Sequence, residues 1–209
     1  MLLRSMCMPN SQLILNQTII DDEWTLVNLP SANEEVKKQA GKVVLFKLTG
    51  ESLPTEHQIN ETIIPETGKI ILPLSVYLKN HDALQRRVEN KEIALWLATH
   101  ETLDALIALK VDINLFPLIA IFVERFQDGR IFSIGNLIRT RYQFKNTLRA
   151  FGDVLQDQLF YLKRSGFDSY LIKSGKDVHE AIKALQSFSD PYQGAVDIKE
   201  PVWKRKVRS

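Results

Sequence analysis

The chain carries five short apolar runs after residue 68, and each is followed by a segment with the spacing of an amphipathic helix. The runs are KIILP (69–73), EIALWLA (92–98), LIAIFVE (118–124), LRAFG (148–152) and SYLIK (169–173). Near-continuous apolar strands that alternate with helices are typical of βαβ units, whose parallel sheet is buried on both faces. The sequence therefore predicts an α/β fold of about five βα units, forming an open parallel sheet or a partial (β/α) barrel with right-handed crossovers. We favour the partial barrel because the units follow one another without a topological switch.

The first part of the chain has a different pattern. The runs QLILNQTII (12–20), EWTLVNL (23–29) and KVVLFKL (42–48) are short, and apolar and polar residues partly alternate in them. Such alternation indicates half-buried antiparallel strands. We therefore expect a β-rich N-terminal arm over residues 1–68, an α/β domain over 69–190 and a basic C-terminal tail over 191–209.

Capping signals predict where several helices begin and end. Asp153 with Gln156, and Asp177 with Glu180, have the spacing of an N-cap residue and its N3 partner. Gly166 follows a predicted helix end, where a left-handed residue is favoured. The apolar stripes expected on the buried helix faces are Ile134, Leu137, Ile138 and Tyr142; Leu155, Leu159 and Leu162; and Val178, Ala181, Ile182 and Leu185.

Composition excludes several classes of protein. The 209 residues include 27 Lys and Arg and 25 Asp and Glu, so the net charge of +2 gives no reason to expect nucleic acid as a partner. The single cysteine, Cys7, excludes an intramolecular disulfide and an iron–sulfur cluster held by this chain alone. The four histidines lack metal-ligand spacing, so we expect no metal site.

Targeting signals are not evident in the sequence. The N-terminal segment lacks a continuous apolar stretch of the roughly 7–15 residues that a signal peptide needs. No stretch approaches the roughly 18 apolar residues of a membrane span. The expectation is a cytoplasmic protein without a membrane partner.

The segment ERFQDGRIF (124–132) is long for a connection at a strand end, where about two to six residues are usual. From Gly129 to Arg149 the chain has five basic residues and no acidic one. The candidate site for an anion or an acidic partner consists of Asp128, Gly129, Arg130, Arg141 and Arg149, because guanidinium groups suit oxyanions. Arg139 is expected to point to water. A solvated helix face preceded by a turn is the alternative that the sequence alone favours.

Two carboxylates follow neighbouring predicted strands. Glu124 ends one apolar run, and Asp153 comes directly after the next. Carboxylates on one rim suit general acid and base catalysis, so these two are the candidate catalytic residues, although no motif assigns a catalytic role. Capping of a helix explains Asp153 without any chemistry, and we favour that interpretation.

Two features near the C-terminus allow two interpretations each. Phe160 lies away from the buried stripe of its helix, so it is either covered by the arm or tail or part of a surface for a partner or oligomer. The ending WKRKVRS places four basic residues among the last six. This run is either a solvated end or a segment that steers the protein to an acidic electron carrier.

The run DGRIFSIGNLIRTRYQFKNTLRAFGDVLQDQLFYLKRSGFDSYLI (128–172) resembles the signature of a proteobacterial family described as oxidoreductases of sulfite reduction. The blocks DDEWTLV, ILPLSVYL and IALWL resemble weaker upstream parts of that signature, so the resemblance covers roughly residues 20–193. Genes of this family often lie beside the gene for the sulfite reductase haemoprotein. The family pattern has Gly and Tyr where this chain has Ile131 and Phe132. A ligand that approaches closely at that Gly would bind differently here.

The resemblance implies an accessory protein of assimilatory sulfite reduction that aids electron delivery to sulfite reductase. Its partner would be the sulfite reductase haemoprotein or an acidic electron carrier. The alternative is an independent α/β enzyme, or a protein that binds a small anion or a flavin at the strand ends. The residues indicate no cofactor, since the dinucleotide fingerprint is missing. A non-covalent flavin is still compatible with them, because flavin sites can use diffuse backbone contacts.

Overall fold

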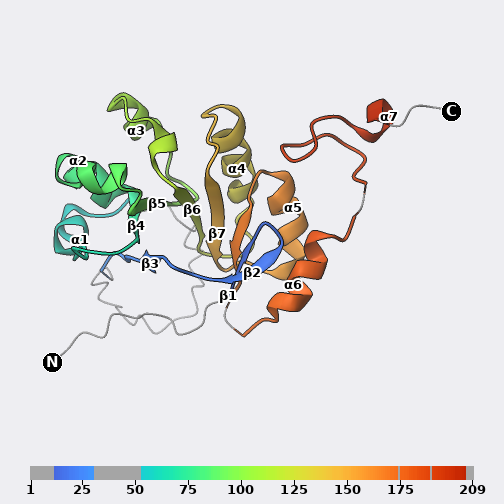
Figure 1. The fold of residues 1–209 in the computed structure, drawn as a ribbon, viewed down its shortest axis with the longest axis horizontal. Helices are drawn as coiled ribbons and strands as arrows, with labels where there is room; N and C mark the ends of the chain where they lie inside the picture. Colours follow the sequence, from blue (N-terminus) through green and yellow to red (C-terminus); the bar gives the residue numbers. More distant parts are fainter. Residues whose placement is uncertain (1–11, 31–52, 174, 189, 206–209) are drawn as a thin grey trace, which may run out of the picture.

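The computed structural model describes residues 12–30, 53–173, 175–188 and 190–205, and Figure 1 shows their arrangement. The sheet has eight strands in the order β2-β1-β8-β7-β6-β5-β4-β3. The strands are β1 (Gln12–Leu15), β2 (Thr18–Asp21), β3 (Thr25–Leu26), β4 (Ile70–Pro73), β5 (Ile93–Ala98), β6 (Leu118–Val123), β7 (Thr147–Gly152) and β8 (Ser169–Leu171).

Helices connect these strands and continue beyond the last one. They are α1 (Glu56–Glu61), α2 (Leu74–Glu89), α3 (Asp104–Ala108), α4 (Arg130–Thr140), α5 (Leu159–Arg164), α6 (Val178–Leu185) and α7 (Val202–Arg205). Two short 3₁₀ turns, Ile113–Leu115 and Gln156–Gln158, precede β6 and α5. None of the helices in the described part of the chain is long and apolar enough to cross a membrane.

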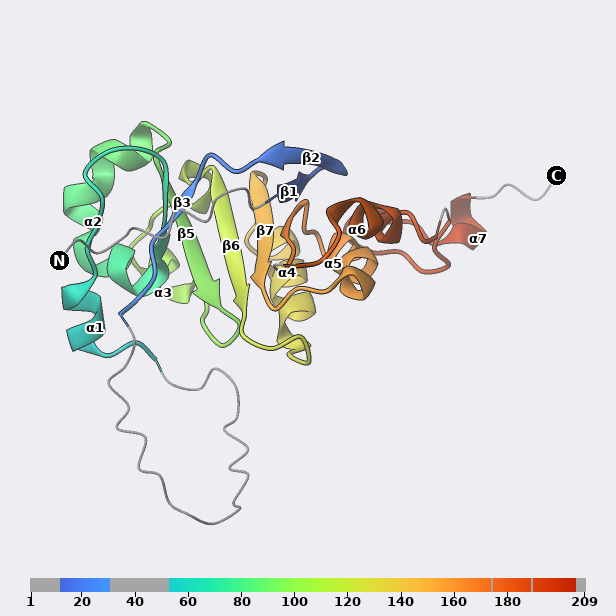
Figure 2. The ribbon, with the colours of Figure 1, turned by 90° about the horizontal axis from the view of Figure 1, so that it is seen from below.

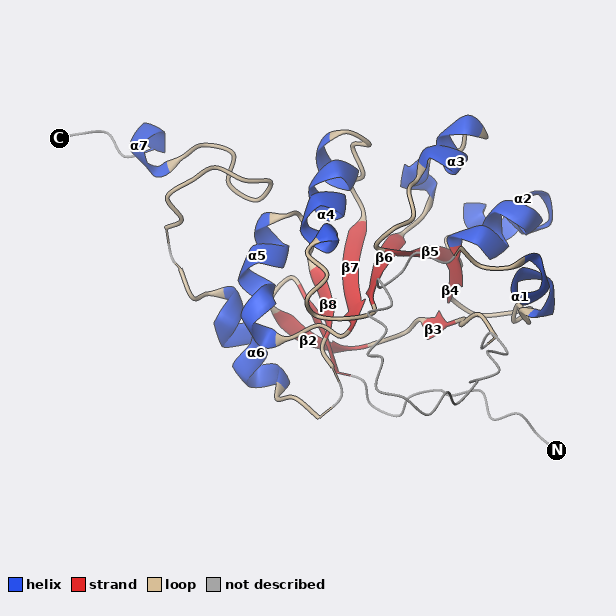
Figure 3. Ribbon diagram, turned by 180° about the vertical axis from the view of Figure 1, so that it is seen from behind, coloured by secondary structure: helices blue, strands red, loops and turns tan. Residues whose placement is uncertain are grey.

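Strands β4 to β8 lie side by side in chain order, and each pairs in parallel with the next. This pairing confirms the prediction of consecutive βα units. Because each crossover returns to the adjacent strand, the connecting helices gather on one face of the sheet. Figure 3 shows α2 to α6 around the outer side of a curled sheet.

The sheet as a whole is mixed, which corrects the expectation of a wholly parallel sheet. β1 pairs antiparallel with β2 and β8, so a hairpin is added to one edge. β3 pairs in parallel with β4 at the other edge, so the expected antiparallel strand over EWTLVNL is wrong. The segment between β2 and β3 runs across the sheet (Figure 2), and the expected arm therefore supplies strands to both edges. The run KVVLFKL lies outside the described residues.

Two of the predicted capping residues, Asp177 and Gly166, are confirmed by the structure. The carboxylate of Asp177 accepts a hydrogen bond from the backbone N–H of His179 at 2.8 Å and so caps α6, as predicted. Gly166 follows α5 with a φ of 101°, which is the left-handed conformation expected there. Both signals depend on residues within a few positions, and the tertiary structure leaves them unchanged.

The buried face of α4 is rotated from the predicted stripe. Its buried residues are Ile131, Gly135 and Ile138, whereas Ile134 and Leu137 are half-buried and Tyr142 lies past the helix end. A Cβ built on Gly135 would lie 2.3 Å from the ring of Phe167. The helix therefore makes its closest approach at a glycine, which a pattern of large apolar residues does not reveal.

The concave face of the sheet has a separate apolar cluster, the inner core. It consists of Ile71, Ala94, Trp96, Leu118, Ala120 and Phe151. Trp24 of the crossing segment, Leu26 of β3 and Leu29 after β3 pack against it. The indole N–H of Trp96 donates a hydrogen bond to the carbonyl of Val27 at 2.9 Å. The N-terminal segment thus covers the face of the sheet opposite to the helices.

Candidate functional site

The carboxyl ends of β5 and β6 meet at the Asp128 carboxylate, which is buried. One oxygen accepts hydrogen bonds from the backbone N–H and Nε of Arg130, at 3.1 and 2.8 Å. The other accepts from Arg130 Nη2 at 2.8 Å and from the hydroxyl of Thr99. These bonds, above all those from Arg130, lower the pKa of Asp128 to about 2. Asp128 is therefore an ionised group that fixes the start of α4.

Gly129, the residue between this pair, has an ordinary conformation. It is the N-cap of α4 with a φ of −68°. A Cβ built on Gly129 would have no atom within 4 Å. The turn at 128–130 consequently depends on the Asp128 carboxylate and not on a glycine backbone.

Asp153 lies at the end of β7 and does not cap a helix, which corrects the interpretation favoured from the sequence. Its Oδ1 accepts a hydrogen bond from Lys173 Nζ at 2.7 Å, and its Oδ2 accepts from the backbone N–H of Phe126 at 3.2 Å. Lys173 is the main reason that the pKa of Asp153 is lowered. The backbone N–H of Asp153 still bonds the carbonyl of Val123 at 2.8 Å, so the chain remains beside β6 here and turns helical only at Gln156. The side chain is thereby directed to the loop after β6.

Glu124 comes directly after β6, so it lies at a strand end next to that of Asp153, as expected. Its side chain is exposed and makes no hydrogen bond or ion pair within the described residues. Among the described residues, the carboxylates of Glu124 and Asp153 have no hydrogen-bond partner in common. Nothing in their arrangement distinguishes an acid from a base.

Two further polar residues at the strand ends, Ser75 and His100, are not among the candidate site residues predicted from the sequence. Both ring nitrogens of His100 and the hydroxyl of Ser75 are buried, without a hydrogen-bond partner among the described residues. Ser75 follows β4 and His100 follows the neighbouring strand β5. Next to His100, the Glu101 carboxylate accepts a bond from the Ala98 N–H at 2.7 Å, and burial raises the pKa of Glu101. Buried polar groups left unpaired destabilise a fold, and in native structures such groups are usually satisfied by the protein or by ordered water.

Arg149 was expected at a strand end, where it would bind an anion or a partner protein, but the structure places it elsewhere. It lies in β7, faces the concave side and is 3% exposed. Its Nη1 and Nη2 donate to the carboxylate of Asp22 at 2.8 and 3.1 Å, and its Nε donates to Ser169 at 3.2 Å. Burial lowers the pKa of Arg149, and Asp22 opposes this shift. Strand alternation decides the outcome, because it turns this side chain inward.

The other arginines of the acid-free segment also fail to form a basic face. Arg139 was expected to point to water, but its side chain is 13% exposed. It bonds the carboxylate of Asp168 at 2.8 Å, and its other bonds go to the carbonyls of Phe144, Asn146 and Gly166. Arg141 is exposed, with its guanidinium 5.6 Å from the ring centre of Tyr142. Of the three candidate arginines, Arg130 and Arg141 are exposed as predicted, and Arg130 is engaged by Asp128.

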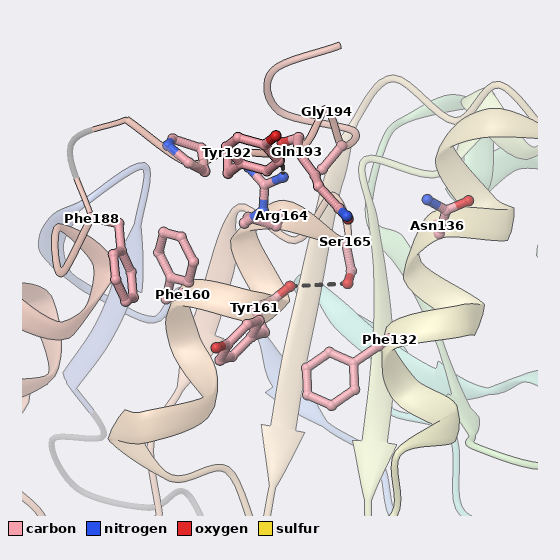
Figure 4. Close-up of a pocket in the computed structure, with 12 residues that line it drawn as sticks. Phe132, Asn136, Phe160, Tyr161, Arg164, Ser165, Phe188, Tyr192, Gln193 and Gly194 are labelled. Atoms are coloured by element: carbon pink, nitrogen blue, oxygen red, sulfur yellow. Dashed lines mark hydrogen bonds between the residues drawn. The ribbon is translucent and has the colours of Figure 1, made fainter. Parts of the chain in front are cut away.

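A separate candidate site, the tail pocket, lies between α4, α5 and the chain after α6 (Figure 4). Its volume is about 660 Å³. Figure 4 shows the ring of Phe132 pointing from α4 toward Tyr161 of α5. The aromatic lining residues are Phe132, Phe160, Tyr161, Phe188 and Tyr192. The sequence offered one signal for this site, namely the position of Phe160 away from the buried stripe of its helix.

Phe160 is explained by this pocket. Its ring centre lies 4.8 Å from that of Phe188 and 5.4 Å from that of Tyr161, and the Arg164 guanidinium lies 5.9 Å away. The side chain is half-buried. Cover by the chain after α6 therefore accounts for its position, and its ring also borders the pocket.

The fold and its two candidate sites define a class: an α/β protein with a curled mixed sheet, helices on the outer face and an aromatic pocket beside its C-terminal segment. The pattern of the bacterial proteins of unknown function called DUF934 matches residues 94–203, more than half of the chain. The chain belongs to this family. No curated protein and no solved structure matches it. The matched region runs from β5 through the tail pocket and does not include β1 to β4.

Proposed function

We propose that this protein is a cytoplasmic accessory of assimilatory sulfite reduction that docks on an acidic partner and aids electron delivery. The partner is the sulfite reductase haemoprotein or an acidic electron carrier. The observation that carries the proposal is the tail pocket, where exposed aromatic side chains lie beside Arg164 and beside a C-terminal segment with more basic than acidic residues. Interfaces are enriched in aromatic residues, and complementary charge speeds association.

The charges at the strand ends support docking over catalysis. Asp128 is bound by Arg130, and Asp153 is bound by Lys173. Asp128, Arg130, Arg149 and Asp153 thus have structural partners within the chain, and of the two candidate catalytic carboxylates only Glu124 has none among the described residues. The family resemblance found in residues 128–172 supplies the link to sulfite reduction.

Co-purification with the haemoprotein tests the proposal. Tagged protein and purified haemoprotein are mixed at low and high salt and recovered together. We expect a complex at low salt that weakens as salt is raised, and that is lost in the Lys204→Glu and Trp203→Ser variants. Lys79→Glu is the matched control, because Lys79 is exposed on α2, far from the tail pocket in the fold. If no complex forms with the haemoprotein or with an acidic electron carrier under any salt condition, the proposal is wrong.

A second candidate function is binding of a small ligand at the strand ends. The buried and unpaired polar atoms of His100 and Ser75 favour it, since ligands of α/β sheets bind at the carboxyl ends of strands. Thermal-shift measurements with sulfite, sulfate, phosphate, flavins and nicotinamides test it. A shift with one compound that disappears in His100→Phe supports this function, and the absence of any shift contradicts it.

A further inference from the structure

Exposed aromatic side chains gather at the tail pocket, which Tyr161, Phe188 and Tyr192 line, and at the adjoining Trp203 of α7. The exposed fractions are 56% for Tyr161, 59% for Phe188, 69% for Tyr192 and 57% for Trp203. The ring centres of Tyr192 and Trp203 lie 5.0 Å apart, so these two stack on each other. Figure 1 shows α7 well away from the sheet and from the other helices. A cluster of large apolar groups on one surface indicates a place where another molecule binds.

The wall of the pocket is held in place before any partner arrives. Arg164 donates to the carbonyl of Gln193 and lies 3.4 Å from the Asp197 carboxylate. Its backbone carbonyl accepts from the N–H of Val196 at 3.1 Å. Arg205 binds Asp190 at 2.7 Å. A surface that is already ordered loses little conformational entropy on binding, which favours affinity.

The charge around the pocket is basic. Asp190 and Asp197 are used in the pairs with Arg205 and Arg164. The side chains of Lys199 and Lys204 make no hydrogen bond or ion pair within the described residues, and Glu200 is the remaining acid of the segment. The sequence from 190 to 209 has five basic and three acidic residues. A partner that matches this surface in charge is acidic.

We infer that the tail pocket binds an extended acidic segment of a partner protein, with an aromatic side chain of that segment inserted beside Phe132 and Tyr161. The carboxylates of the segment meet two lysines. Lys199 lines an adjoining hollow that shares Asn136, Gly194 and Ala195 with the tail pocket, and Lys204 follows Trp203, which stacks on Tyr192. This inference rests on the proposed function, for which it specifies the chemistry of the partner. The binding follows the usual anatomy of an interface, with aromatic anchors in the centre and charges at the rim.

Fluorescence anisotropy with a labelled peptide of alternating glutamates and phenylalanines tests this inference on the full chain. Two comparison peptides carry lysine in place of every glutamate, or serine in place of every phenylalanine. We expect the acidic aromatic peptide to bind at least tenfold more tightly than either. Tyr192→Ser and Lys204→Glu weaken its binding at least fivefold. The matched controls are Ile107→Ser and Lys79→Glu, exposed residues of α3 and α2 that leave binding unchanged.

Three results would overturn the inference. They are equal or absent binding of the three peptides, full binding by Tyr192→Ser, and self-association of the wild type that Tyr192→Ser abolishes in sedimentation. The last would show that a second copy occupies the pocket. Peptide binding without a haemoprotein or carrier complex leaves the inference standing and removes the proposed function. If the protein forms a complex with the haemoprotein and neither Tyr192→Ser nor Lys204→Glu weakens it, the proposed function stands and the inference about the tail pocket is wrong.

Discussion

The guanidinium of Arg149 is bound by the carboxylate of Asp22, 127 positions earlier in the chain, across the concave face of the sheet. The two groups are joined by two hydrogen bonds of 2.8 and 3.1 Å. Their side chains are 4% and 12% exposed, so both charges are largely removed from water. This pair fastens the crossing N-terminal segment over the inner core.

Removal of the Asp22 charge is expected to destabilise the protein strongly. In Asp22→Leu the buried Arg149 guanidinium has no counter-charge, and loss of one partner of a buried pair costs about 3–5 kcal/mol. Urea unfolding followed by circular dichroism measures the change. The double variant Asp22→Leu/Arg149→Met should lose less than Asp22→Leu alone, because no buried charge is left.

The neighbouring acid provides the control. Glu23 pairs with Lys69 at 2.7 Å, but its side chain is 62% exposed. Glu23→Gln should therefore change the free energy of unfolding by less than about 1 kcal/mol, as is usual for surface pairs. Equal losses for Asp22→Leu and Glu23→Gln would contradict the role given to the buried pair.

Asp128 is expected to make stability depend on acid pH. Its pKa is about 2 in the folded protein and 3.8 without its partners, so its contribution is complete above about pH 4 and is lost as the pH falls toward 2. Asp128→Asn should lower the free energy of unfolding at neutral pH by about 1.5–3 kcal/mol, the range for hydrogen bonds to charged groups. Unfolding curves at several acid pH values should show a smaller loss between pH 4 and 2 in this variant than in the wild type.

Asp153 links two segments, because its carboxylate binds Phe126 in the loop after β6 and Lys173 just after β8. We therefore expect that serine at this position does not maintain the stability of the protein. A serine hydroxyl would cap a helix, but it is too short to bind Lys173 and the backbone N–H of Phe126 together. Asp153→Ser and Asp153→Ala are therefore expected to reduce the melting temperature equally. When Asp153→Ser is introduced into the Lys173→Met variant, the additional loss of melting temperature should be smaller than in the wild type, because the bond from Lys173 is already absent. A serine variant as stable as the wild type would restore the capping interpretation.

Gly135 of α4 is expected to resist substitution by alanine. Alanine favours a helix by about 1 kcal/mol, but here its Cβ would lie 2.3 Å from the buried ring of Phe167. Overpacking of a core costs about 1–3 kcal/mol, so Gly135→Ala should be destabilised in thermal melts. Gly129→Ala, with open space at its Cβ, should differ from the wild type by less than about 0.5 kcal/mol. A Gly135→Ala protein that melts at or above the wild-type temperature would show that Phe167 can move.

The sequence by itself determined β4 to β8 and the helices between them. A strand buried on both faces needs a nearly continuous apolar run, and IALWLA and LIAIFV satisfy that need wherever the other strands lie. Asp177 caps α6 for a similar reason, because the bond it makes is with a residue two positions away. Such features depend on contacts within one element, which a local pattern records.

Only the tertiary structure decided the roles of the charged residues and the edges of the sheet. Arg139, Arg149 and Asp153 each bind a partner at least 20 positions away, and no local spacing states which distant group neutralises a buried charge. β3 is two residues long and joins β4 only because the chain crosses the concave face. The tail pocket likewise exists because α4, α5 and the chain after α6 meet in space. A sequence pattern specifies which side chains must be buried, while the packing of distant segments decides what each of them contacts.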